Sequence, residues 1–449
     1  MTLRSWLLTA ILLIPAQHAW ATCYRVTSVG AANTTANAAI RPGEGTAGAW
    51  AGACDTCNGS LGIPSVINVS DPSFQPYGTL IASSVVPFTQ YGATAGYNPE
   101  YVFFRCEGQD AVYEMWSTNG DDVYSGWFQG GDSVGLSLGL QDAYRTAWPN
   151  VLLRLTHLAS GEPFTHIWRE RRLTGLDIDS RGYQLVKAKN LSAVRAEVFS
   201  APRDPTYNYY SDTVSSQLYA YAQPAAYIAI KGPGLAYPTV GQTHYGNWSG
   251  WYGNWPGALG LYNQVTLKRY PTCSVSSVTP YVVFPSISVS EINAGGSREV
   301  PFQINFRCQS TVLNSASTNG TAIGIKVSSG ALAASSSLGL INAQGGLAYL
   351  LSDRYGQAGM AQGVGIRVLR GGAPINLLAN EDSANGSGAA GRGWYPVVSN
   401  TANLTGTING IGQYTETFRA RLEKLSIGTM PTVRPGRVEA TAQVVIRVQ

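Results

Sequence analysis

The last twelve residues of the chain, from Val438 to Gln449, alternate between apolar and polar side chains. A period of two over this length predicts a β-strand with one face in a core and the other in water. Pro435 and Gly436 predict a turn just before it. Within the strand, Val445 alone breaks the alternation. The apolar face consists of Val438, Ala440, Ala442, Val444, Ile446 and Val448.

Three earlier stretches of the last two fifths of the chain show the same alternation, and each predicts a half-buried strand. The first, SREVPFQINFRC at 297–308, ends on a cysteine that shares the apolar face, so its sulfur should point into a core. The others are AQGVGIRVLRGG at 361–372 and YTETFRARL at 414–422. Their apolar faces are Val300, Phe302, Ile304, Phe306 and Cys308; Val364, Ile366 and Val368; and Tyr414, Phe418, Ala420 and Leu422.

The pair Cys273 and Cys308, the AQGVGI strand and the terminal strand after a Pro-Gly turn resemble the pilin domain of chaperone–usher fimbriae. The resemblance covers residues 273–449 and is strongest to two-domain tip adhesins, such as the mannose-binding adhesins of type 1 fimbriae. It implies an immunoglobulin-like sandwich that lacks its last strand, with a Cys273–Cys308 disulfide. Many pilins carry an aromatic residue second from the end, whereas this chain has Val448.

The resemblance also implies partners. A periplasmic chaperone fills the open groove first, and at the outer-membrane usher the extension of the next pilus subunit replaces it. The groove residues would be Val282 and Phe284 together with the apolar face of the terminal strand. The stretch before Cys273, LYNQVTLKRYPT, carries Val265 and Leu267 as the close of a preceding module. The chain would then accept a strand but donate none, which places it at the distal tip.

Residues 1–21 have the pattern of a secretory signal peptide. Arg4 is the charged start, the apolar run extends from Trp6 to Ile14, and Ala19-Trp20-Ala21 fits a cleavage site. This run is too short for a transmembrane span. We therefore expect maturation at Thr22 and export through the periplasm to the bacterial surface. The mature mannose-binding adhesins begin with an aromatic residue that helps form the sugar pocket, so Thr22 does not carry over mannose specificity.

Composition narrows the class of protein further. Among 449 residues, 51 are Gly, 25 are Tyr and 11 are Trp, while only 12% are charged. This composition is typical of a turn-rich, all-β, secreted protein, and its aromatic content argues against disorder. The formal charge of +4 comes without a clustered run of Lys and Arg, which argues against nucleic acid as a partner.

The six cysteines of an exported chain are expected to form disulfides. YVFFRC, ending at Cys106, is similar to INFRC, ending at Cys308, which favours Cys23–Cys106 and leaves Cys54 with Cys57. The alternative pairs Cys23 with Cys54 or Cys57. The Cys54-x-x-Cys57 spacing lacks the βαβ context of a redox site, and no histidine is spaced to complete a zinc site. We expect no metal and no cofactor.

Residues 22–268 are predicted to form a separate β-sandwich or jelly-roll-like module, followed by a short linker at 269–272. Strand-like runs such as YVFFRC and AAYIAIKG recur between turn clusters. One short helix is predicted from Leu140 to Ala147. The fold class is thus all-β: an N-terminal lectin-like adhesin sandwich and an incomplete immunoglobulin-like pilin domain.

Aromatic residues concentrate in three loops of the first module, at 116–132, 244–255 and 204–212. Aromatic rings stack on the C–H faces of sugars, and carboxylates and amides accept hydrogen bonds from the sugar hydroxyl groups. The first loop combines both kinds of side chain with an Asn-Gly turn, so we predict that it binds glycan. The predicted ligand residues are Trp116, Asn119, Asp121, Asp122, Tyr124 and Trp127.

Catalytic chemistry is not predicted. Glu114, Asp121, Asp122 and Asp132 contain the carboxylates that a glycosidase needs, but Asp in such loops more often forms turns. No nucleophile elbow or phosphate-binding glycine loop occurs. The leading hypothesis is a tip adhesin that binds a host or surface glycan. Two alternatives stay open: a structural tip or biofilm subunit that binds protein or no glycan, and a secreted carbohydrate-active enzyme with a pilin-like anchor.

Overall fold

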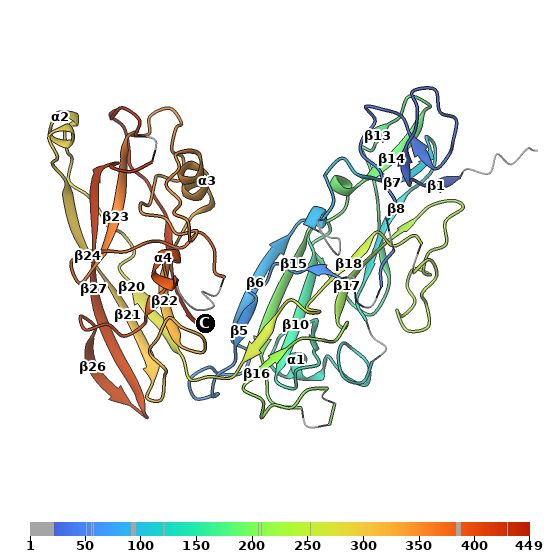
Figure 1. The fold of residues 1–449 in the computed structure, drawn as a ribbon. Coiled ribbons are helices and arrows are strands. Elements are labelled where there is room, and N and C mark those ends of the chain that lie inside the picture. Colours follow the sequence, from blue (N-terminus) through green and yellow to red (C-terminus); the bar gives the residue numbers. More distant parts are fainter. Residues whose placement is uncertain are drawn as a thin grey trace, which may run out of the picture.

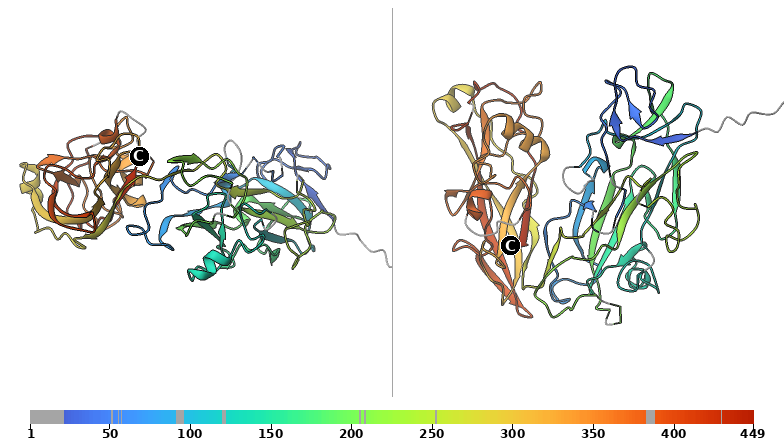
Figure 2. Two further views of the ribbon diagram at one scale, coloured as in Figure 1. Left: turned by 90° about the horizontal axis from the view of Figure 1, so that it is seen from below. Right: turned by 45° about the vertical axis from the view of Figure 1, so that its right-hand side comes forward.

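The structure is a computed structural model that describes residues 22–50, 52–54, 56, 58–90, 96–119, 122–204, 206–207, 209–251, 253–382, 388–428 and 430–449. The signal sequence predicted at 1–21 lies outside these residues. Figures 1 and 2 show two strand-rich bodies that are joined at one end and diverge from there. We keep the predicted division and call residues 22–268 the N-terminal module and residues 273–449 the C-terminal domain.

Sheets and short loops make up most of the N-terminal module. One sheet has the order β1 (Cys23–Arg25), β7 (Val102–Glu107), β14 (Tyr183–Lys187) and β13 (Asp177–Ile178). A second has the order β11 (Glu162–Pro163), β10 (Val151–His157), β15 (Val194–Ser200) and β6 (Leu80–Val86), with β9 (Ala143–Arg145) beside β10. A third has the order β12 (Arg169–Arg172), β8 (Tyr113–Ser117), β17 (Ala225–Lys231), β18 (Gly257–Gly260) and β4 (Gly59–Ser60).

Two smaller sheets complete this module in the described residues. β16 (Ser216–Leu218), β19 (Thr266–Lys268) and β5 (Val66–Asn68) form one, and β2 (Ser28–Val29) and β3 (Ala39–Ile40) form the other. Short helical turns are α1 (Ser133–Ser137), η1 (Phe88–Gln90) and η2 (Ala188–Asn190). A large apolar core draws residues from Cys23 to Leu267 and contains the buried rings of Trp116, Trp148, Trp168 and Trp255, and two smaller buried clusters lie beside it. Val265 and Leu267 belong to this core, as the sequence predicted.

The C-terminal domain is a sandwich of two sheets around its own core. The larger sheet has the order β20 (Cys273–Val278), β21 (Arg298–Gln309), β27 (Ile411–Lys424), β23 (Val364–Arg370) and β24 (Ala373–Pro374), with β26 (Asn403–Ile408) beside β27. The smaller sheet has the order β25 (Tyr395–Pro396), β22 (Thr321–Val327) and β28 (Ala442–Val448). The helices are α2 (Val289–Asn293), α3 (Ser329–Ser337) and α4 (Ala389–Arg392).

The all-β class is therefore confirmed, and so are two disulfides. Cys23 bonds to Cys106 and Cys273 bonds to Cys308, in each case across a directly paired position of neighbouring strands. Cys54 is also disulfide-bonded, while Cys57, its predicted partner, lies outside the described residues. The predicted faces of β21, β23 and β27 point into the core of the C-terminal domain.

The predicted helix from Leu140 to Ala147 is wrong. The helix α1 occupies Ser133–Ser137 instead, and Ala143–Arg145 form β9 against β10. Gly139 and Asp142 both have positive φ, at 71° and 58°, which breaks the helix and turns the chain back.

The terminal strand starts later than its alternation predicts. β28 begins at Ala442, while the preceding residues form isolated bridges at Arg434 and Arg437 and accept single backbone hydrogen bonds at Glu439 and Thr441. Val445 breaks the alternation because the outer face of β28 is also covered. It is 7% exposed and belongs to a small cluster with Leu378 and Trp394.

Candidate functional sites

An open groove separates two strands of the C-terminal domain. In the described residues β28 pairs with β22 and β20 pairs with β21, and each of these two strands is the last of its sheet. Each therefore has one unpaired edge. After Val278 the chain continues without regular pairing to Ser288. Within the described residues, the backbone N–H groups of Tyr281 to Phe284 donate to no backbone carbonyl. Unpaired strand edges of this kind are hydrogen-bonding templates for a further strand.

Two rows of half-buried apolar side chains line this groove. One row follows β20 and its extension and the other lies in and before β28, and both pack against the domain core. At the end of the groove near α2 they enclose a cavity of about 550 Å³, lined by Val282, Phe284, Val438 and their neighbours. The rows are Val275, Val278, Val282, Phe284 and Ile287, facing Val438, Ala440, Val444 and Ile446.

The structure thus brings together most of the residues predicted for the groove. Ala442 is exposed, and Val448 is almost fully buried at the far end of β28. The strand just before Cys273, β19, lies between β16 and β5 in a sheet of the N-terminal module. The residues that precede the C-terminal domain are therefore already part of a sheet.

The second candidate site is a cluster of tyrosines on the N-terminal module. Tyr124, Tyr209 and Tyr221 have ring centroids 4.8 to 6.1 Å apart, and Tyr124 and Tyr209 are exposed. Asp122 accepts hydrogen bonds from the Tyr124 backbone N–H at 2.7 Å and from the Tyr221 hydroxyl. The carboxylate therefore fixes the orientation of the Tyr221 ring and is bonded to the backbone of Tyr124.

Arg145 on β9 holds the two loops of this cluster together. Its Nη1 donates to the Val123 carbonyl at 2.9 Å, and its Nε lies 3.2 Å from the Asp204 carboxylate. Its guanidinium carbon lies 4.6 Å from the centre of the Tyr207 ring. Burial lowers the pKa of Arg145 from its ordinary value, against the opposing effect of Asp204. A largely buried cation thus supports an exposed aromatic surface.

The other predicted ligand residues occupy different positions. Trp116 is 2% exposed and its ring stacks on His157, so it belongs to the core and not to a sugar-stacking surface. Asn119 is buried and bonds to the Tyr227 hydroxyl and the Ala225 N–H. Asp121 lies outside the described residues. Trp127 is half-buried and its ring stacks on His166 at 3.6 Å.

The loop at 244–255 divides in a similar way. Trp255 and His244 are buried, whereas Tyr245 and Trp248 are exposed. His244 packs among the rings of Trp168, Tyr227 and Trp255. This burial lowers the pKa of His244 to about 3. The buried half of the loop stabilises the core, while Tyr245 and Trp248 are exposed for contact outside it.

Sequence reasoning missed Tyr221 as part of the tyrosine cluster. It lies in the stretch YAYAQP, where nothing marks it as a neighbour of Asp122. The loop at 204–212 was predicted only as a third candidate, and the structure shows that it meets the first loop through Tyr209.

The structure does not present the carboxylate Glu114 as a catalytic group. It is buried, and it accepts hydrogen bonds from Arg171 Nε at 2.6 Å and from the Ser192 N–H at 2.8 Å. Across the described residues, no group of three or more His, Cys, Asp or Glu side chains is arranged to hold a metal ion. Likewise, none of the helices in the described part is long and apolar enough to span a membrane.

Comparison with known proteins assigns the C-terminal region. Residues 261–449 match the family described as fimbrial protein. A search of curated proteins found no match. Three solved structures show the extent of similarity to known folds. PapA, the rod subunit of the P pilus, is 14% identical, with a TM-score of 0.23 and coverage of 39% of this chain and 99% of its own.

The matches to the other two structures cover both parts of the chain. The complex of CsuC with the tip subunit CsuE, from archaic Csu pili of Acinetobacter baumannii, is 10% identical, with a TM-score of 0.20 and coverage of 87% and 99%. The tip adhesin CupB6 of Pseudomonas aeruginosa is 12% identical, with a TM-score of 0.24 and coverage of 87% and 91%. The family match thus identifies residues 261–449 as similar to fimbrial proteins, as the cysteine pair and strand pattern of this region predicted.

Proposed function

We propose that this protein is the tip adhesin of a chaperone–usher fimbria. The observation that carries the proposal is the open groove of the C-terminal domain, combined with the position of β19. The groove has unpaired strand edges and apolar walls, so it accepts a strand. The segment before Cys273 is held in a sheet of the N-terminal module and is not free to be donated. A subunit that accepts a strand but has none to give occupies the distal end.

The partners follow from this groove. A periplasmic chaperone fills it during export, and the outer-membrane usher exchanges that strand for the extension of the next subunit. The protein then reaches the cell surface at the fimbrial tip. Export in this form needs no catalysis by the chain itself, and we propose that it is not an enzyme.

Co-expression tests the groove. The mature chain is expressed in a periplasm with and without its cognate chaperone, and the soluble yield is compared. We expect soluble protein only with the chaperone, because the apolar rows of the empty groove aggregate. Equal yields of monomeric, protease-resistant protein in both cultures contradict the proposal.

We further propose that the N-terminal module binds a glycan through Tyr124, Tyr209, Tyr221 and Asp122. The exposed rings offer flat apolar surfaces, and the Asp122 carboxylate can accept hydrogen bonds from sugar hydroxyl groups. This cluster replaces Trp116 and Asn119 of the sequence prediction, because both are buried. It keeps the predicted loop and adds side chains from two further segments.

A glycan array probed with the chaperone-bound mature chain tests this site. For any sugar that binds, Tyr209→Ala should weaken binding about tenfold, since a stacked ring contributes about 1–1.5 kcal/mol. Asp122→Asn should act in the same direction because it loses a charged acceptor. Tyr245→Ala is the matched control, since this tyrosine is equally exposed but lies in another loop. If the control loses binding and Tyr209→Ala does not, the site is elsewhere. If no glycan binds, a structural tip or biofilm subunit is favoured.

A further inference from the structure

The groove of the C-terminal domain has two different ends. Near α2 its cavity is lined only by residues of that domain, from Val282 to Ile292 and from Ala361 to Val438. At the other end, where β20 begins and β28 finishes, a cavity of about 310 Å³ is lined by residues of both domains. We call these the outer and the inner end.

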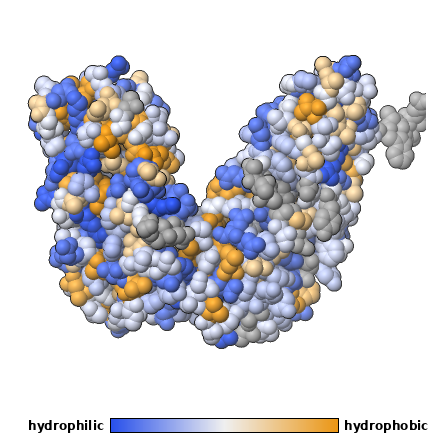
Figure 3. All heavy atoms as spheres, in the orientation of Figure 1, coloured by the Kyte–Doolittle hydropathy of each residue, from blue (hydrophilic) through white to orange (hydrophobic). Residues whose placement is uncertain are grey.

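The N-terminal module provides one wall of the inner end. Val66, Phe74, Leu80 and Ile81 face the first residues of β20 and the last residues of β28 across this cavity. Figure 1 shows β5 and β6 as the part of the N-terminal module nearest the C-terminal domain, and Figure 3 shows the notch between the two bodies. β6 is the last strand of its sheet, so it presents an edge on this side.

Arg307 attaches this wall to the groove. Its Nε donates to the Ser274 hydroxyl at 3.1 Å, and its Nη2 donates to the Phe74 carbonyl at 3.2 Å. Its guanidinium carbon lies 5.1 Å from the centre of the Phe74 ring. One side chain of β21 therefore contacts both the start of β20 and the opposite wall.

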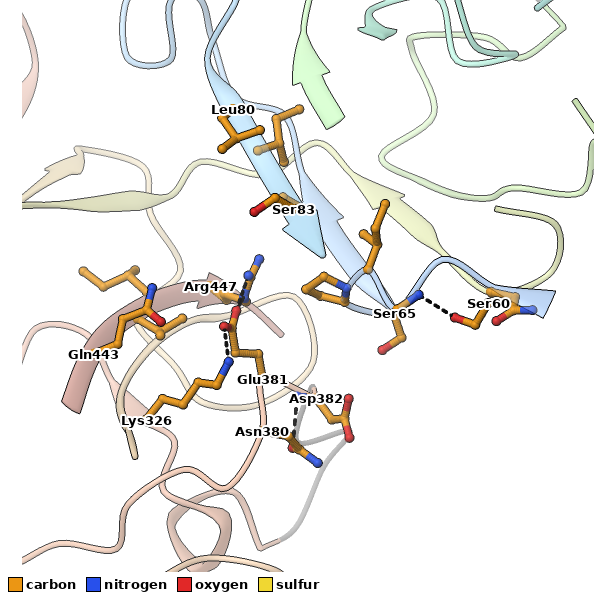
Figure 4. A pocket seen from close by; sticks show the side chains of 18 of the residues that line it. Ser60, Ser65, Leu80, Ser83, Lys326, Asn380, Glu381, Asp382, Gln443 and Arg447 are labelled. Atoms are coloured by element: carbon orange, nitrogen blue, oxygen red, sulfur yellow. Dashed lines mark hydrogen bonds and ion pairs between the residues drawn. The ribbon is translucent and has the colours of Figure 1, made fainter. Parts of the chain in front are cut away.

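Leu80 is the exposed apolar residue of this wall. It is 48% exposed although it lies beside Ile446 and Val448 of the groove. Figure 4 shows Leu80 on β6 above Arg447, which forms an ion pair with Glu381 at the neighbouring polar part of the notch. About half of this apolar side chain is thus in contact with water in the described structure.

We infer that the strand which fills the groove also contacts the N-terminal module, with an apolar residue at its inner end packed on Leu80 and Ile81. This inference rests on the proposed acceptance of a donor strand. The occupant is an extended segment of a second subunit, because unpaired strand edges and two apolar rows require alternating side chains. One strand then touches both domains, so its insertion fixes their relative orientation.

The length of the groove sets the length of the probe. From Val448 to Val438 the chain advances by about ten residues, which corresponds to about 33 Å of extended strand. A peptide of about twelve alternating Val and Thr residues, with a terminal lysine for solubility, spans both ends. Placing a photoreactive phenylalanine at the first apolar position, or in a second peptide at the last, tests either direction of binding.

The mature chain is refolded from guanidinium with each peptide, irradiated and digested, and the crosslinks are mapped by mass. One terminus of the peptide should crosslink within residues 66–81, and the other within 282–289 or 433–438. Leu80→Gln should weaken peptide binding about tenfold, since it removes the burial of one large apolar side chain. Val85→Gln, on the same strand, exposed but away from this cavity, should bind as the unaltered chain does.

The outcomes are distinguishable. If no peptide binds, the proposed strand acceptance itself fails. If peptides bind but both termini crosslink only to the C-terminal domain, the contact with the N-terminal module is refuted while the groove stands. Equal affinity of Leu80→Gln and Val85→Gln also refutes it. Crosslinking needs no altered chain, so this readout holds even where a variant folds poorly.

Discussion

The two parts of the molecule begin alike and end differently. The first strand of each is bonded by a disulfide to the longer strand with which it pairs, at Cys23–Cys106 and at Cys273–Cys308, with Cα atoms 4.0 Å apart in both. Each closes with an alternating strand. In the N-terminal module this closing strand, β19, has neighbours on both sides, whereas β28 has only β22 within the described residues.

This difference has an energetic consequence. An apolar row next to an unpaired edge contributes little burial until another strand covers it, while the chain still loses its conformational entropy on folding. We therefore expect the N-terminal module to be stable by itself, with a free energy of unfolding that exceeds the loss from one substitution. The C-terminal domain should fold only with a bound strand. Equal perturbations of the two should then have unequal results.

The disulfides give the largest expected effect. They close loops of 83 and 35 residues, for which the chain-entropy argument gives about 4 kcal/mol each. Replacing Cys23 and Cys106 by serine should lower the melting temperature of the N-terminal module but leave it folded. Replacing Cys273 and Cys308 should prevent the C-terminal domain from accumulating. Limited proteolysis with mass identification of the fragments checks this, and the reverse pattern would refute the comparison.

Buried carboxylates give the next largest effect. Glu416 on β27 is fully buried and accepts two hydrogen bonds from Arg370, at 2.8 and 2.7 Å. Burial alone would raise the pKa of Glu416, but the bonds from Arg370 and Ser399 outweigh it and hold that pKa below its ordinary value. Glu416→Gln leaves the arginine without its charged partner and should cost about 3 kcal/mol.

The matched change in the N-terminal module is Glu114→Gln, which removes the partner of Arg171. We expect a similar loss of free energy of unfolding, but a folded module. Calorimetry of both variants with a groove-filling peptide, and again without it, separates the two. If the C-terminal domain of the Glu416→Gln chain folds without peptide, the expectation that this domain is unstable without a bound strand is wrong.

Acidification should lower the free energy of unfolding of the two domains over different pH ranges, and by smaller amounts. The pKa of buried His244 is about 3 in the folded module, well below the value in an unfolded chain. Below about pH 6.5 the unfolded state therefore binds a proton that the folded state does not, and stability falls as pH decreases until about pH 3. Glu416 acts lower: with a depressed pKa, its contribution is complete above about pH 4.5 and is lost on further acidification.

From pH 7 to pH 5 we thus expect the N-terminal module to lose about 2 kcal/mol through His244. His244→Phe should flatten this slope, because an aromatic ring without a titrating group fills the same site. Melting curves of the two domains between pH 7 and pH 4 provide the measurement. An unchanged slope in the variant would show that other groups carry the pH dependence.

Much of this contrast could be predicted from sequence, for a physical reason. Alternation reports which face of a strand is apolar, and the similarity of YVFFRC to INFRC identified the Cys23–Cys106 pair. Composition of a loop does not show which aromatic residues face a core, since Trp116 and Tyr124 lie in the same predicted loop, but Trp116 is in β8 and buried and only Tyr124 is exposed. The meeting of Asp122 with Tyr221 depends on the packing of distant segments, so no local pattern could reveal it.

Two neighbouring cations where β19 meets the linker give the smallest expected effect. Lys268, the last residue of β19, is buried, and its Nζ donates to the Asn319 side chain at 3.1 Å and to the Gln449 carbonyl in the C-terminal domain. Burial lowers the pKa of Lys268 from its ordinary value. The neighbouring Arg269 instead donates to Val214 and Asn150 of the N-terminal module. The side chains of these adjacent cations thus form hydrogen bonds with different domains.

We expect Lys268→Met to cost the C-terminal domain about 1–2 kcal/mol, since hydrogen bonds from a charged donor contribute on this order. It should also broaden the distribution of interdomain distances, measured by fluorescence energy transfer between labels on the two domains. Arg269→Met is the matched control and should lower the stability of the N-terminal module while leaving that distribution unchanged. If both variants broaden it equally, the linker as a whole restrains the domains. If neither does, the restraint lies in the Arg307–Phe74 contact, and Arg307→Met should then broaden the distribution.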